Sequence, residues 1–97
     1  LTATPFFHPS SDHVYGKVDP KFKGEANEFI DLFKKYNVAE VFAGDVHFYT
    51  SYVEPRTGLH MTTVGAVTST RNAQSPRFAL VDVYESGAYT VVDTEIQ

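Results

Sequence analysis

The 97-residue sequence contains no cysteine, which excludes disulfide bonds and thiolate metal sites together. Any metal ion must then be held by imidazole, carboxylate, amide or backbone oxygen, donors that favour Mn, Fe, Zn or Mg. The lack of cysteine also slightly favours a reducing cytoplasm, although it does not fix the compartment. The sequence begins with Leu1 and not with Met, and we interpret this as processing or truncation upstream.

Positive charge is scarce as well. Eight Lys and Arg residues face twelve Asp and Glu, which gives a net charge of −4, and no basic stripe follows any element. Nucleic-acid binding through phosphate neutralisation is therefore disfavoured. No run approaches the roughly 20 apolar residues of a membrane span, so no membrane partner is expected. The 42% hydrophobic and 14% aromatic content suits a single small domain over residues 1–97, or a piece of a larger one.

One helix is predicted at about residues 25–36. Ala26, Phe29, Ile30 and Phe33 follow the i, i+3, i+4, i+7 pattern of one apolar helix face. Asn37 is typical of the left-handed residue that ends a helix. The 16-residue stretch before this helix contains Pro and Gly and lacks periodicity, and such long connections are often functional loops or lids.

The other segments predict strands. An apolar run at 38–44 follows the helix directly, and turn residues in "PRTG" and "ESG" predict two hairpins. Expected strand segments are 1–8, 38–44, 48–54, 59–64, 77–84 and 88–96. We expect one mixed sheet that includes residues 38–44 and both hairpins. The predicted core is Phe29, Ile30, Phe33, Val41, Phe42, Val64, Leu80, Val81 and Val83.

Polar chemistry gathers where two predicted strands end. Asp45 and His47 are two residues apart, so on an extended segment their side chains share a face. His8 also leaves a predicted strand end, and parallel strands present their carboxyl ends to one crevice. His8, Asp45 and His47 are therefore expected to converge as half of a carboxylate–imidazole metal centre. The structural alternative is that Asp45 forms an Asx-type turn and His8 is a hydrogen-bonded structural residue.

Two further histidines are weaker candidates. His13 lies in the long loop, where it is either a solvated side chain or a substrate-binding contact. His60 lies in a hairpin strand and is expected to be a cross-strand surface residue.

The segments "FFHPSSD", "KKYNVAEVFAGDVHFYTSY" and "TTVGAV" together resemble the C-terminal half of calcineurin-like metallophosphoesterases. The resemblance implies an α/β fold, namely half of an αββα sandwich with one main helix and a mixed, mostly antiparallel sheet. It implies a hydrolase, a phosphatase-type enzyme that cleaves phosphoester bonds with water activated by two divalent ions, Mn, Fe or Zn. His8, Asp45 and His47 would be metal ligands, with His13 on the substrate side.

Two departures from the family pattern limit what the resemblance implies. The family's Gly–His–x–His reads Gly44–Asp45–Val46–His47 here, so a carboxylate replaces the first imidazole. The family's earlier blocks, Asp–x–His, Gly–Asp and Gly–Asn–His, do not occur as an ordered series in this chain. We therefore expect a fragment that is inactive alone, with exposed sheet edges through which it self-associates. The alternative is a non-catalytic β-rich interaction domain with structural histidines.

Overall fold

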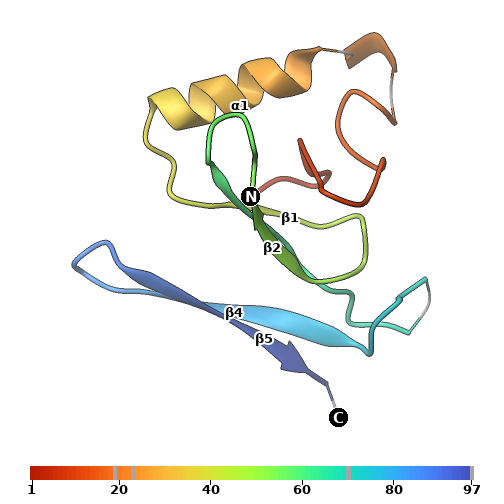
Figure 1. Ribbon diagram of the computed structural model, residues 1–97. Helices are drawn as coiled ribbons and strands as arrows, with labels where there is room; N and C mark the ends of the chain where they lie inside the picture. Colours follow the sequence, from red (N-terminus) through yellow and green to blue (C-terminus); the bar gives the residue numbers. More distant parts are fainter. Residues whose placement is uncertain (19, 23, 70, 97) are drawn as a thin grey trace.

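A computed structural model gives the fold of the chain and describes residues 1–18, 20–22, 24–69 and 71–96. It is a small α+β domain in which one α-helix is followed by five strands (Figure 1). The elements are the 3₁₀-helix η1 (Pro20–Phe22), α1 (Glu25–Lys35), β1 (Val41–Ala43), β2 (Thr50–Val53), β3 (His60–Thr63), β4 (Arg77–Val83) and β5 (Tyr89–Glu95). No helix in these ranges is long and apolar enough to cross a membrane.

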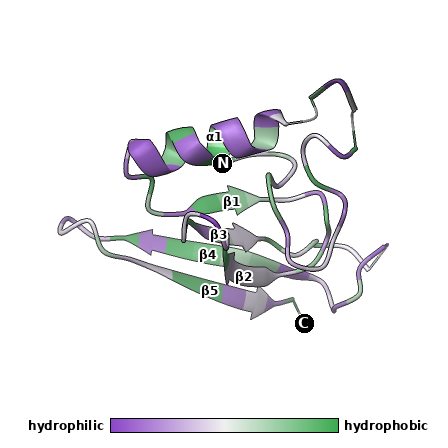
Figure 2. Cartoon of the chain, turned by 45° about the horizontal axis from the view of Figure 1, so that its top comes forward, coloured by the Kyte–Doolittle hydropathy of each residue, from purple (hydrophilic) through white to green (hydrophobic). Residues whose placement is uncertain are grey.

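The strands form two separate sheets, so the prediction of one sheet is wrong. The first sheet has the order β1-β3-β2, with β1 parallel and β2 antiparallel to β3. The second is the antiparallel two-stranded ribbon β4–β5. In Figure 1 α1 lies on one side of the three-stranded sheet and the ribbon on the other, and in Figure 2 β5 is again the strand drawn farthest from α1. The structure is therefore layered as helix, sheet and ribbon.

The helix agrees closely with the prediction. It starts after Gly24, whose positive φ of 90° suits glycine, and it carries acidic residues in its first turn and lysines in its last. Asn37 has the expected left-handed conformation, with φ 58°, and its N–H donates to the carbonyl of Lys34. The buried Ile30 and the partly buried Phe33 pack the helix against the three-stranded sheet.

The core is smaller than predicted, and it sits between α1 and the three-stranded sheet. Ile30 and Val41 are buried as expected, and the sequence analysis missed Leu59 and Met61, which are each 2% exposed. Phe33 is partly buried against this core, and Phe42 and Val64 are half-buried. The prediction is wrong for the more exposed residues Phe29, Leu80, Val81 and Val83. The ribbon strands have seven residues against three or four in the other sheet, and ribbon residues such as Leu80 and Val83 stay exposed to solvent.

The N-terminal segment does not form the strand predicted over residues 1–8. A single parallel bridge joins Thr2 to Ala43, supported by hydrogen bonds from Thr2 N–H to the Phe42 carbonyl and from Gly44 N–H to the Ala3 carbonyl. Pro5 has no N–H to continue a ladder, and the chain turns inward there. The bridge nevertheless places the N-terminal segment beside β1, in the same direction.

Candidate functional site

The candidate site is built on the turn that follows β1. Asp45 and His47 both have left-handed backbone conformations, with φ of 71° and 67°. Such angles are uncommon outside glycine, although Asp and His adopt them more readily than most residues, and each costs about 1 kcal/mol or more. The expectation that both side chains share one face assumed extended backbone, and the turn does not have it.

The Asp45 carboxylate is held by residues from the N-terminal part of the chain. Its Oδ2 accepts hydrogen bonds from Thr4 Oγ1 at 2.9 Å and from His13 Nε2 at 2.7 Å. The side chains of His13 and Asp45 are 50% and 39% exposed, so this hydrogen-bonded pair lies at the surface. The structure thus joins the predicted substrate contact, His13, to one of the predicted metal ligands. Because 32 positions separate the two residues, no local pattern indicates this contact.

His8 is buried beside the same turn. It is 6% exposed, and its ring meets the rings of Phe48 and Tyr52 edge-on, with centroids 5.2 and 5.0 Å away. Burial lowers the pKa of His8 from its ordinary value of 6.5, because the charged ring loses its hydration. Phe48 is the neighbour of His47, so the His8 ring lies close to the turn after β1.

The hydrogen bonds of His8 define its protonation state. Its Nδ1 accepts from the backbone N–H groups of Ser10 and Ser11, both at 3.1 Å. A nitrogen that accepts two N–H donors carries no proton, so the proton of the neutral ring is on Nε2. Within the described residues, Nε2 is buried and has no hydrogen-bond partner. The ring itself packs against Phe48 and Tyr52.

The predicted metal ligands do not form a ready-made ion site. Across the described ranges, no group of three or more His, Asp or Glu side chains is arranged to hold a metal ion. His8 would also have to ligate through Nε2 as the other tautomer, with its two backbone donors displaced from Nδ1. The half-buried His47 and the pair of Asp45 with His13 add no third donor beside it. His60 is exposed in β3, as expected.

Tyr52 is a positioning residue that the sequence analysis missed. Its hydroxyl donates to the carbonyl of Phe7, directly before His8, and its ring contacts the His8 ring. Burial, with the nearby Glu40 charge as a second cause, raises the pKa of Tyr52 to about 12. The alternation of β2, in which Tyr52 faces inward between exposed Ser51 and Val53, was the available signal.

Comparisons with known proteins give no relative: no family model, no curated protein and no solved structure matches this chain.

Proposed function

We propose that this chain is the C-terminal half of a metal-dependent phosphoesterase domain of the αββα type. It hydrolyses phosphoester bonds only together with an N-terminal half that supplies the remaining ligands. The proposal starts from the ordered resemblance of "FFHPSSD", "VFAGDVHFY" and "TTVGAV" to calcineurin-like metallophosphoesterases. The order of helix, sheet and ribbon is compatible with half of such a sandwich.

One structural observation supports the proposal most. The N-terminal segment runs parallel to β1, and the loop that follows it bonds to the turn that follows β1, through His13 and Asp45. The segments that carry His8 and His47 therefore leave neighbouring parallel elements at the same edge. Ligands of α/β sheets bind at such an edge, outside the carboxyl ends of the strands.

The contributions of this chain follow from its own contacts. The Asp45 carboxylate fixes the orientation of His13 through Nε2, so the Nδ1 side of the ring faces away from the pair. When His13 is protonated, its Nδ1–H is a charge-assisted donor suited to a phosphoryl oxygen. The metal ions implied by the resemblance would activate water and neutralise phosphoryl charge, but the described residues hold no preformed site, so we assign no step to them.

The test compares this chain with the protein translated from the whole reading frame. Both are assayed with p-nitrophenyl phosphate and bis(p-nitrophenyl) phosphate, in Mn²⁺, in Zn²⁺ and in EDTA. We expect no turnover above background from residues 1–97 alone and EDTA-sensitive turnover from the whole protein. His47→Ala should abolish that turnover, and His60→Ala is the matched surface control. A whole protein without metal-dependent turnover of either ester would refute the proposal.

The second candidate function is a β-rich interaction domain that pairs with a second copy of itself. The outward face of the ribbon supports it, because Phe78, Leu80 and Val92 are 44%, 52% and 50% exposed and Leu80 lies directly opposite Val92. Hydrophobic stretches are visible on both ribbon strands (Figure 2). Among the described residues the ribbon has two strands only, so its outer edges are open to further pairing. A partner ribbon stacked on this face would cover the apolar surface, and one paired at an edge would complete the backbone hydrogen bonds there.

A further inference from the structure

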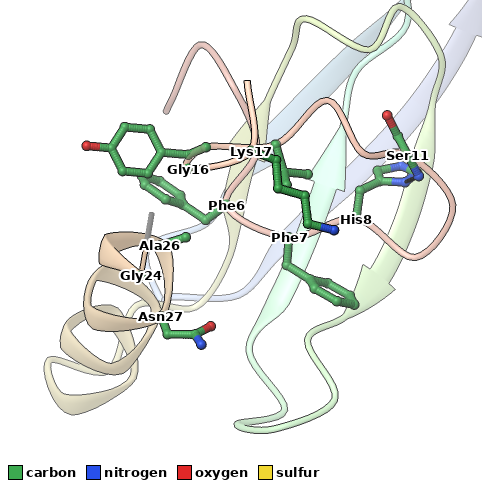
Figure 3. A pocket seen from close by; sticks show the side chains of 11 residues that line it. Phe6, Phe7, His8, Ser11, Gly16, Lys17, Gly24, Ala26 and Asn27 are labelled. Atoms are coloured by element: carbon green, nitrogen blue, oxygen red, sulfur yellow. Dashed lines mark hydrogen bonds between the residues drawn. The ribbon is translucent and has the colours of Figure 1, made fainter. Parts of the chain in front are cut away.

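A cavity of about 520 Å³ lies between the start of α1, the segment around Phe6 and Phe7, and the long loop (Figure 3). Its size falls in the range of small-molecule sites, which are mostly apolar and carry a few polar groups. The cavity does not include Asp45 or His47. It is therefore a separate feature from the candidate phosphoesterase site, although His8 contributes to its wall.

The apolar wall is backed by ring–ring packing. The Phe6 ring meets those of Tyr15 and Phe29, each at 5.2 Å between centroids, and that of Phe33 at 5.5 Å. Val14, only 5% exposed, forms another part of the lining. A flat aromatic ligand would bury its faces against this wall without rearranging it, and aromatic pairs add attraction beyond area burial.

Lys17 supplies a positive charge at the cavity. Its side chain extends between Phe7 and His8 in Figure 3. Its Nζ donates to Asp12 Oδ1 at 3.1 Å, and the two side chains are 63% and 93% exposed. Exposed ion pairs of this kind contribute little, so a carboxylate on a ligand can replace Asp12 as the partner of Lys17.

The start of α1 adds to the preference for an anion. Gly24 and Ala26 line the cavity, and Gly24 caps the 11-residue helix without any side-chain hydrogen bond. The first N–H groups of a helix carry partial positive charge. The Glu25 carboxylate, which accepts from Tyr15 Oη at 3.0 Å, lies on the same turn. Its negative charge favours a singly charged carboxylate over a phosphate dianion.

We propose that this cavity binds a small aromatic carboxylate, with the ring system against Phe6 and Tyr15 and the carboxylate on Lys17. The site shares His8 with the candidate phosphoesterase site, but the proposed binding involves neither metal nor the turn after β1 and does not depend on phosphoester hydrolysis. Binding is therefore expected in residues 1–97 alone.

The experiment titrates residues 1–97 with 2-naphthoate and, in parallel, with the uncharged 2-naphthalenemethanol, by calorimetry and by the NMR signals of the aromatic rings. We expect naphthoate to shift the Phe6 and Tyr15 rings and to bind more tightly than the alcohol. Lys17→Met should weaken naphthoate binding by up to about fivefold, which is the scale of one partly exposed charge contact. Asp12→Asn should tighten it, because Lys17 no longer has a competing partner.

Two more variants locate the ligand. Ala26→Leu places a larger side chain in the cavity wall and should abolish binding while the circular dichroism of the helix is retained. Lys34→Met, in the last turn of α1, removes an equal charge elsewhere and should leave the dissociation constant unchanged. Equal affinity for the alcohol, or no change in Lys17→Met and Asp12→Asn, would overturn the proposal. Those two variants decide the matter if Ala26→Leu does not fold.

Discussion

Burial of His8 makes the stability of the fold depend on pH in a defined window. Burial lowers the pKa of His8 below 6.5, so the folded chain binds fewer protons than the unfolded chain as the pH falls below that value. The stabilisation from the neutral ring is fully present above about pH 6.5. It is lost as the pH falls from there through the lowered pKa of the folded state. One proton gives a slope of at most about 1.4 kcal/mol per pH unit.

Two substitutions isolate this effect. In His8→Asn the amide oxygen can take the place of Nδ1 and keep the N–H contacts of Ser10 and Ser11. In His8→Phe a ring remains against Phe48 and Tyr52, while both N–H contacts are lost, at about 1 kcal/mol each. Neither replacement titrates near neutral pH, so both variants should lose the part of the pH dependence of the unfolding free energy that His8 causes.

Urea unfolding from pH 8 to pH 5, in EDTA to remove metal ions, measures the effect. The difference in unfolding free energy between the original chain and each variant should be constant above about pH 6.5 and should shrink as the pH is lowered. Exposed His60→Gln serves as the control and should leave the slope unchanged. Identical pH dependence in the original chain and both His8 variants would refute the reasoning.

Three further predictions concern the turn of the first hairpin and the ribbon. Glu54 is only 3% exposed, and its carboxylate accepts hydrogen bonds from the N–H and the hydroxyl of Thr57. Glu54→Ala should therefore lower the free energy of unfolding, measured in urea, by about 2–3 kcal/mol, whereas Glu85→Ala at an exposed position should leave it almost unchanged. Arg77→Met removes the guanidinium that donates to the half-buried Asp93 carboxylate at 2.6 Å. The free energy of unfolding should fall by about 3 kcal/mol in the same assay, and adding Asp93→Asn should restore part of it. If the ribbon pairs with a second copy, sedimentation should show concentration-dependent association that Leu80→Lys abolishes. Equal association in both chains would refute that pairing.

Local patterns predicted the helix and the hairpins, because their signals lie within a few residues. The spacing of Phe29, Ile30 and Phe33 predicted α1, and Pro55 with Gly58 predicted the turn between β2 and β3. The pairing of the two hairpins into one sheet was wrong, since edge-to-edge pairing depends on contacts that no local pattern encodes. Core predictions in the ribbon failed for the same reason.

The candidate site was predicted only in its location. The carboxyl end of β1 and the N-terminal segment do meet there, as the parallel-strand argument required. The spacing of Asp45 and His47 did not reveal their left-handed backbone, nor the bond from His13 to Asp45. Whether His8, Asp45 and His47 ligate metal in a complete domain stays a prediction.

The most direct test of the phosphoesterase proposal is the metal content of the protein translated from the whole reading frame. Metal bound per chain is measured by mass spectrometry after dialysis, for the original protein and for His8→Ala, Asp45→Ala and His47→Ala, with His60→Ala as control. We predict two ions in the original protein and in the control, in line with two-metal hydrolysis, and selective loss of one ion in Asp45→Ala and of the other in His47→Ala. Full occupancy in all three site variants, or no bound metal in the original protein, would contradict the account.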